Sequence, residues 1–170
     1  MPAVSNSSPL ILFSKAGRLD LLQNVFGKVF IPQAVFEEVV TEGAGRPGSG
    51  EIANTPWIRL RSVAGHTVAA GLAGKVGRGE AEAIALAQEL GEDIPLLIDD
   101  RLGRRLAREM GLTVVGSAGV LVQAKARRVI PLLSPVLDEL RSLGLYLSDA
   151  ARHEILVEAD EAPAAEVGEE

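Results

Sequence analysis

The stretch that decides the fold is residues 95–115, with the sequence PLLIDDRLGRRLAREMGLTVV. Its first four residues form an apolar run with the length of a buried strand, and the two aspartates after it open a segment with helical periodicity. Gly111 ends that segment, and residues 113–115 form a second run of β-branched residues. A buried strand, a helix and another short strand in this order indicate a βαβ unit, and therefore a parallel sheet covered by helices.

The same alternation of short apolar runs and helical segments extends in both directions along the chain. Residues 3–5 and 29–31 are apolar runs that predict two further buried strands. Residues 57–63 alternate as WIRLRSV, a pattern typical of a strand at the edge of a sheet. The fold class that we predict is α/β: a three-layer domain with a roughly five-stranded parallel sheet flanked by helices.

The predicted helices have local start and stop signals. Ser8 followed by Pro9 predicts the N-cap and first residue of a helix over 9–16. Residues 43–56 are rich in glycine and proline, which predicts a loop that could be mobile. The other predicted helices begin at residue 32 or cover 18–25, 79–90, 101–110, 118–127, 131–142 and 149–158.

The net charge of -6 comes from the C-terminal end of the chain. Residues 158–170 hold six of the 23 acidic residues and no lysine or arginine, so residues 1–157 have 17 acidic and 17 basic residues. Because this end lacks apolar periodicity, we expect a folded domain over 1–157 and an acidic disordered tail over 158–170. The net charge therefore does not exclude a nucleic-acid partner for the folded domain.

Composition excludes other classes of site. The chain of 170 residues has the size of one domain and no cysteine, which excludes disulfides, a thiolate nucleophile and cysteine-ligated zinc. His66 and His153 are the only histidines, and neither lies in a recognisable catalytic motif. The few aromatic residues exclude base stacking as the main mode of nucleic-acid binding. The chain lacks an apolar run of ~20 residues and a signal-peptide pattern, so we expect a soluble, cytoplasmic protein without a membrane partner.

Polar residues follow the first and the fourth predicted strand directly. They are Asn6, Ser7 and Ser8 after the first strand, and Asp99 and Asp100 after the fourth. In an open parallel sheet, ligands bind beyond the carboxyl ends of the strands, at the point where the strand order reverses. If the two strands are neighbours at that point, these residues converge. The alternative is that the aspartates only cap the helix that follows.

Two helices offer further carboxylates. On a helical wheel Glu80 falls on the apolar face with Ile84, whereas Glu82 falls on the side that looks solvated. A carboxylate on an apolar face needs a partner because burying it unpaired is costly, and a metal ion is one candidate. A similar comparison favours Glu38 over Glu37 in the helix after the second strand. Taken singly, Glu80 also fits ordinary helix-start chemistry and Glu38 an ordinary solvated face.

A set of arginines begins beside the two aspartates. The spacing i, i+3, i+4 and i+7 predicts one basic helical face, formed by Arg101, Arg104, Arg105 and Arg108. Lys125, Arg127 and Arg128 form a second basic cluster. An acidic pocket beside a basic face is what metal-dependent phosphodiester cleavage requires, because the acids hold Mg²⁺ or Mn²⁺ and the bases hold phosphates. The alternative is a solvated helix face with local ion pairs.

Six stretches together resemble the PIN-domain family. They are VSNSSPLILFSKAGRLDLL at 4–22, IPQAVFEEV at 31–39, GEAEAIALA at 79–87, LIDDRLGRRLA at 97–107, GLTVVGSAGVLVQA at 111–124 and GLYLSDAARHEIL at 144–156. They cover residues 3–157 in the order of the family, and they are most similar to a prokaryotic subfamily of uncharacterised or VapC-type toxin-like proteins. The resemblance implies a Mg²⁺- or Mn²⁺-dependent ribonuclease, the toxin component of a toxin–antitoxin system.

The resemblance also implies roles for individual residues. The family's acidic, catalytic positions match Glu38, Glu80 and Asp100. The implied metal ligands are these three with Asn6, the adjacent Asp99 and Glu82, the competing assignment to Glu80. The implied nucleic-acid-binding residues are Ser8, at a hydroxyl position that often supports the first acid, and Arg101, Arg104, Arg105 and Arg108. The implied partners are single-stranded or structured RNA, an antitoxin protein and a second copy of the chain in a homodimer.

One position departs from the family pattern. The first acidic position of the wider family is Asn6 in this chain. An amide offers a metal a neutral carbonyl oxygen but supplies no charge and cannot act as a base, so we expect lower metal affinity and activity. The alternative function is therefore a catalytically weak or inactive PIN-like module that binds RNA or a protein. A receiver-like phospho-acceptor domain fits less well, because Asn6 stands where an acidic pair is needed and Gly116 and Ser117 follow the last strand in place of a lysine.

Overall fold

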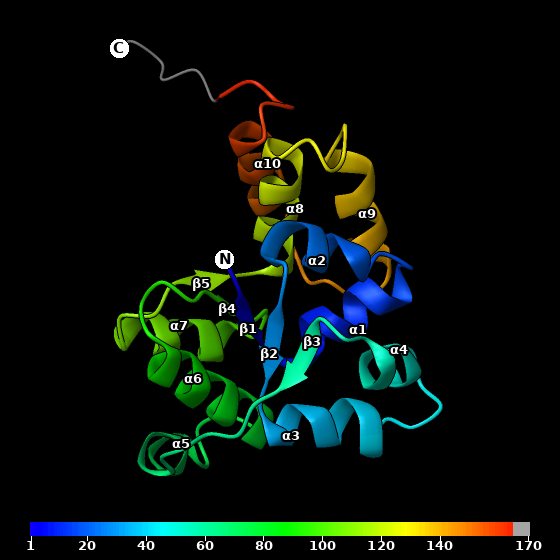
Figure 1. The fold of residues 1–170 in the computed structure, drawn as a ribbon. Helices are drawn as coiled ribbons and strands as arrows, with labels where there is room; N and C mark the ends of the chain where they lie inside the picture. Colours follow the sequence, from blue (N-terminus) through cyan, green and yellow to red (C-terminus); the bar gives the residue numbers. More distant parts are fainter. Residues whose placement is uncertain (165–170) are drawn as a thin grey trace.

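The computed structural model describes residues 1–164, and Figure 1 shows how their helices and strands are arranged. Five strands form one all-parallel sheet in the order β3-β2-β1-β4-β5. Their bounds are β1 Ala3–Ser5, β2 Val29–Ile31, β3 Ile58–Leu60, β4 Leu96–Leu97 and β5 Val114–Val115. The predicted α/β fold class is confirmed, and the alternating segment at 57–63 supplies the edge strand β3.

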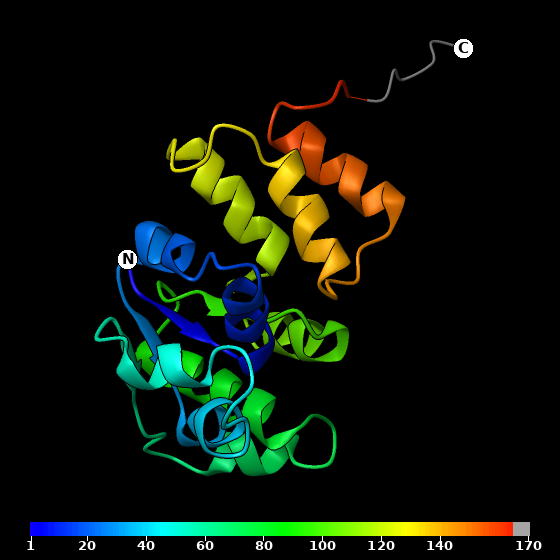
Figure 2. The same cartoon turned by 90° about the vertical axis from the view of Figure 1, so that its right-hand side faces the viewer.

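The sheet separates two hydrophobic cores, because successive side chains of a strand point to opposite faces. On β2, Val29 and Ile31 belong to one core and Phe30 packs against the other. The first core is covered by α1 (Ser7–Lys15), α2 (Asp20–Phe26), α3 (Gln33–Phe36) with its continuation η1 (Glu37–Thr41), α4 (Ser49–Asn54), α8 (Ser117–Ala126), α9 (Ser134–Ser142) and α10 (Asp149–Glu158). The second is covered by α5 (Thr67–Leu72), α6 (Arg78–Leu90) and α7 (Arg101–Glu109). Helices on both faces make the three layers visible in Figures 1 and 2.

Two local predictions are wrong. The first helix begins at Ser7, so Asn6 and not Ser8 is its N-cap residue, and Ser8 lies exposed in the first turn. Pro9 is compatible with this earlier start because proline is tolerated throughout the first turn, where its missing N–H has no helical acceptor. The loop predicted at 43–56 contains α4, because the buried side chain of Ile52 fixes this segment to the first core.

Among residues 1–164, none of the helices has the length and apolar character that a membrane span requires.

The C-terminal helices α8, α9 and α10 lie side by side beyond the sheet (Figure 2). Glu161, just after α10, contacts both the start of α9 and Lys125 on α8. The carboxylate of Glu161 accepts hydrogen bonds from the backbone N–H groups of Leu133, at 2.6 Å, and Ser134, at 3.0 Å. It also lies 2.9 Å from Nζ of Lys125. Glu158 ends α10 and Glu161 contacts α9 and Lys125, so both residues of the predicted tail over 158–170 pack on the domain; residues 165–170 lie outside the described part.

Replacement of Glu161 by glutamine is expected to lower the free energy of unfolding by about 1–3 kcal/mol at pH 7. Burial raises the pKa of Glu161, but the N–H of Leu133, the Lys125 ammonium and Ser134 more than offset this and lower it from 4.5 to about 2. A lowered folded-state pKa stabilises the protein above the unfolded value, and this stabilisation disappears as pH falls from about 4.5 toward 2. Urea unfolding of both proteins between pH 7 and pH 3 measures the difference, with the exposed Glu158→Gln as control. A difference that stays constant over this range would contradict the assignment.

Candidate functional site

The strands β1 and β4 are neighbours at the centre of the sheet. Val4 pairs with Leu96, and the backbone N–H of Asn6 donates to the carbonyl oxygen of Leu97 at 2.9 Å. The sheet continues from β1 to β2 on one side and from β4 to β5 on the other, so the strand order reverses between β1 and β4. The condition stated from the sequence, that the first and fourth strands are neighbours, is therefore met, at the position where open parallel sheets bind ligands.

Asn6 is the residue by which the chain leaves β1, and it is only 1% exposed. Its Nδ2 donates a long hydrogen bond of 3.4 Å to Oε1 of Glu80 on α6. Its Oδ1 is buried and has no hydrogen-bond partner among residues 1–164. A buried acceptor without a donor costs on the order of 1–3 kcal/mol. A cation or a water molecule bound at Oδ1 would remove this cost.

Gly79, at the start of α6, allows Glu38 to approach Asn6. A Cβ atom at position 79 would lie 2.8 Å from Oε2 of Glu38 and 3.4 Å from Oδ1 of Asn6. A larger residue at position 79 would make the flexible, exposed side chain of Glu38 shift. The amide oxygen of Asn6 and the carboxylate of Glu38 thus both lie near this point beside the first turn of α6, and Glu80 accepts from the amide nitrogen of Asn6 from that turn.

Glu38 lies in η1, the π-helical continuation of α3, where the N–H of Glu42 donates to the carbonyl oxygen of Glu37 at 2.7 Å. Partial burial raises the pKa of Glu38, the Ser7 hydroxyl lowers it, and repulsion from the Glu80 and Glu42 carboxylates raises it further. The net direction is upward. Single π-turns are often found at functional sites, where they change the direction of a side chain within a helix.

The neighbouring carboxylates Glu37 and Glu82 are held away from Asn6 by other partners. Arg78 lies between them, 2.7 Å from Oε2 of Glu37 and 3.0 Å from Oε2 of Glu82. Oε1 of Glu82 accepts from the backbone N–H of Ala34 at 3.2 Å, at the start of α3. The expected solvated position of Glu82 is wrong, because its side chain is only 17% exposed and joins α6 to α3.

Asp99 and Asp100 both bind the first turns of helices. Asp99 accepts from the backbone N–H of Ser117 at 2.7 Å and from its hydroxyl at 2.5 Å, at the start of α8. Asp100 is the N-cap residue of α7, and its Oδ2 accepts from the N–H of Gly103 at 2.7 Å. The capping alternative therefore describes contacts that are present. Both oxygens of Asp99 are engaged in this way, while Asp100 is exposed and uses Oδ2 for its cap.

An open cleft of about 560 Å³ runs over this edge of the sheet. Its polar lining residues come from three elements and include Glu80, Asp99, Asp100, Arg101 and Ser8. Ser8 thus lines the cleft from the exposed side of α1. Ser7, one residue earlier, is buried, and its hydroxyl has no hydrogen-bond partner among residues 1–164.

The predicted arginine face on α7 is divided between two environments. Arg101, Arg105 and Arg108 are exposed, and Arg105 makes a loose ion pair of 3.9 Å with Glu109. Arg104 instead turns inward, and burial followed by repulsion from Arg108 lowers its pKa, while Asp99 raises it. The second basic cluster serves the fold, because Lys125 donates to the carbonyl oxygen of Ala159 at 2.5 Å and Arg127 to that of Val25.

The donor set at the reversal point fits a weakly held divalent cation. Within residues 1–164, no group of three or more histidine, aspartate or glutamate side chains is close enough to hold a metal ion by itself. Asn6 completes a mixed set of one amide oxygen and the carboxylates of Glu38 and Glu80. A cation would satisfy the unpaired Oδ1 of Asn6 and reduce the repulsion between the two carboxylates, and oxygen donors suit Mg²⁺ or Mn²⁺.

The sequence prediction missed one residue of this arrangement, Gly79. Ser7 was expected among the polar residues that follow the first strand, and the structure places it as the buried first residue of α1. Gly79 had one signal, its position directly before the first-turn acid Glu80. The π-helical turn that carries Glu38 has no recognised sequence signature.

A family model described as a PIN domain matches residues 2–161, nearly the whole chain. No curated protein and no solved structure matches the chain.

Proposed function

The chain belongs to the PIN-domain family, whose members are generally nucleases, and we propose that it is a divalent-metal-dependent endoribonuclease acting on single-stranded RNA. The observation that carries this proposal is the grouping of Asn6, Glu38 and Glu80 where the strand order reverses, with Asp100 lining the same cleft as Glu80. Carboxylates that can hold a divalent metal, grouped beside exposed arginines, suit cleavage of a phosphodiester.

Glu38, Glu80 and Asn6 would hold Mg²⁺ or Mn²⁺ in this proposal, with Asp100 as the acid on the facing side of the cleft. When bound, such an ion acts as a Lewis acid on the phosphate and lowers the pKa of a bound water. Glu82 and Asp99 are less suited, because their oxygens already bind Ala34, Arg78 and Ser117.

Glu38 and the arginines of α7 would have different roles in this proposal. Partial burial and repulsion from Glu80 both raise the pKa of Glu38, and a bound cation would relieve that repulsion. Arg101 lines the cleft and would bind the phosphate next to the one cleaved, while Arg105 and Arg108 continue along the exposed side of α7. Arg104 would act indirectly, since it faces Asp99.

The biological setting that we propose follows from the resemblance to VapC-type proteins. In this setting the chain is the toxin of a toxin–antitoxin pair and forms a homodimer. The neutral Asn6 favours a second candidate function, a weak or inactive module that binds RNA or a protein partner. Both candidate functions use the same cleft, and they differ in whether a phosphodiester bond of the bound RNA is cleaved.

Incubation of the purified protein with a labelled single-stranded RNA should give cleavage with Mn²⁺ or Mg²⁺ and none with EDTA. Asp100→Asn is the informative variant, because asparagine also caps helices and therefore keeps the α7 cap while removing the charge. We expect its cleavage rate to fall at least about 10-fold with little change in melting temperature. Cleavage by Asp100→Asn at the wild-type rate would reject the proposed site, and RNA binding without cleavage would favour the binding module.

A further inference from the structure

Tyr146 is the one exposed aromatic side chain of the described chain, with 93% of its surface accessible. The other aromatic residues are buried or partly buried: Phe13, Phe26, Phe30, Phe36 and Trp57. Tyrosine usually covers apolar surface with its ring when it lies on a folded domain. The ring of Tyr146 has both faces available to a ligand.

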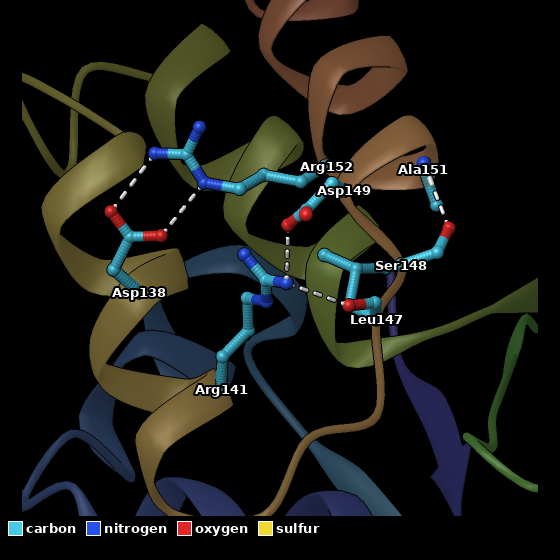
Figure 3. Close-up of polar contacts among 7 residues, drawn as sticks. All are labelled: Asp138, Arg141, Leu147, Ser148, Asp149, Ala151 and Arg152. Atoms are coloured by element: carbon cyan, nitrogen blue, oxygen red, sulfur yellow. Dashed lines mark hydrogen bonds and ion pairs between the residues drawn. The ribbon is translucent and has the colours of Figure 1, made fainter.

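The loop that carries Tyr146 is held at both ends, as Figure 3 shows for its connection to α10. Arg141 on α9 donates to the carbonyl oxygen of Leu147 at 2.9 Å and pairs with Asp149 at 2.9 Å. The hydroxyl of Ser148 caps α10 by accepting from the N–H of Ala151 at 3.1 Å.

The apolar neighbours of Tyr146 in this loop prevent its ring from turning inward. Leu145 and Leu147 pack against the first core, and the N–H of Leu145 donates to the carbonyl oxygen of Leu140 at 3.0 Å. Burial alternates along this loop, with Leu145 and Leu147 half-buried and Tyr146 exposed between them. The anchoring of both leucines in the core therefore accounts for the exposed position of the ring.

Tyr146 lies where two clefts meet. It lines the acidic cleft together with Glu80, Asp100 and Arg101. It also lines a second cleft of about 420 Å³ between α8 and α10, to which Arg104 contributes. Asp99 and Leu145 border both clefts. The second cleft is itself lined by Glu154 and Glu158, and Tyr146 lies where it adjoins the acidic cleft.

We propose that Tyr146 is a stacking platform for an unpaired nucleobase, one that positions the RNA strand beside the acidic cleft. This inference rests on the proposed function, because it assigns the residue that orients the substrate of that site. Every base has an aromatic face, so stacking holds a strand without selecting its sequence. The ring also supplies attraction at a cleft whose carboxylates repel the phosphates. Tyr146 is thus a positioning residue and not a catalytic one.

The single tyrosine of the chain makes the test specific. Protein labelled with ¹³C-tyrosine gives one set of ring signals, which can be followed by NMR during titration with a short single-stranded RNA in EDTA. Stacking is expected to shift these signals upfield. An oligomer of the same length without bases should bind the arginines and leave the ring signals unchanged. Ring signals that stay in place while the base-containing RNA binds would overturn the inference.

Affinity of fluorescently labelled RNA for the full chain, measured by anisotropy, provides a second readout. Tyr146→Leu is expected to weaken binding about 5- to 150-fold, whereas Tyr146→Phe keeps the ring and should bind within about 2-fold of wild type. Leu132→Ala is the control, since Leu132 is an exposed apolar residue before α9. Equal affinity of the leucine variant and wild type would reject the stacking role and leave the nuclease proposal intact. An absence of RNA binding by the wild type would reject both.

Discussion

Replacement of Glu80 by glutamine is expected to reduce metal-dependent cleavage of single-stranded RNA by about 100-fold or more. Glutamine keeps the size of the side chain and still offers an oxygen to Nδ2 of Asn6, so the fold should be retained. What is lost is one of the two negative charges beside the amide oxygen of Asn6. The measurement is the cleavage rate as a function of Mn²⁺ concentration, and the reduction should be partly reversed at high Mn²⁺.

The neighbouring glutamates make this result diagnostic. Glu82 is the competing ligand on the same helix, but its oxygens bind Ala34 and Arg78. Glu82→Gln should therefore lower the melting temperature, and it should reduce the cleavage rate much less than Glu80→Gln does. Glu92→Gln, at an exposed position before β4, controls for the loss of one charge. The reverse ranking, with Glu82→Gln inactive and Glu80→Gln active, would show that Glu82 and not Glu80 is the metal ligand.

Asn6→Asp is expected to have opposite effects with and without metal. In EDTA the new carboxylate is buried, loses the hydrogen bond to Glu80 and faces Glu38, which should lower the free energy of unfolding by about 3 kcal/mol. Mn²⁺ should restore this stability, because a third carboxylate strengthens the donor set. Thermal unfolding with EDTA and with Mn²⁺ measures both effects, and the rise in melting temperature on adding Mn²⁺ should be larger for the variant than for wild type.

The same variant separates the two candidate functions. If the wild type is inert and Asn6→Asp cleaves RNA, the chain as it stands is a binding module with a recoverable site. If both cleave and the variant is faster, the wild type is a nuclease of reduced metal affinity. A variant destabilised equally in EDTA and in Mn²⁺ would mean that no metal binds beside residue 6.

Much of the fold could be predicted from sequence because parallel strands that are buried on both faces form continuous apolar runs. The run at 95–98 and the β-branched residues at 113–115 gave β4 and β5, and the alternation at 57–63 gave the edge position of β3. The adjacency of β1 and β4, on which the site depends, could be stated only as a condition. It is a tertiary property, fixed by which helices cover which face of the sheet.

The details that sequence reasoning missed depend on contacts between distant segments. The helical wheel separated Glu80 from Glu82 but placed Glu82 in solvent, since nothing near residue 82 in the sequence indicates that it caps α3. Glu161 looked like part of an acidic tail because its partners, the first turn of α9 and Lys125, lie about 30 residues earlier in the chain. The π-turn at Glu38 changes the direction of a side chain within a helix, and no pattern in the sequence indicates it.

The central position of β1 has a consequence for how the chain is made. On the ribosome β1 emerges before its partner β4, which follows about 90 residues later, since Val4 pairs with Leu96. At 5–20 residues per second this delay is on the order of ten seconds, during which one edge of the central strand is open to mispairing. Asn6, Glu38 and Glu80 all precede Leu96, whereas Asp100 follows it. A nascent chain halted before Leu96 therefore carries three of the site's residues without the strand that completes the sheet, and chaperone capture of such chains should cease once residues 96–97 have left the exit tunnel.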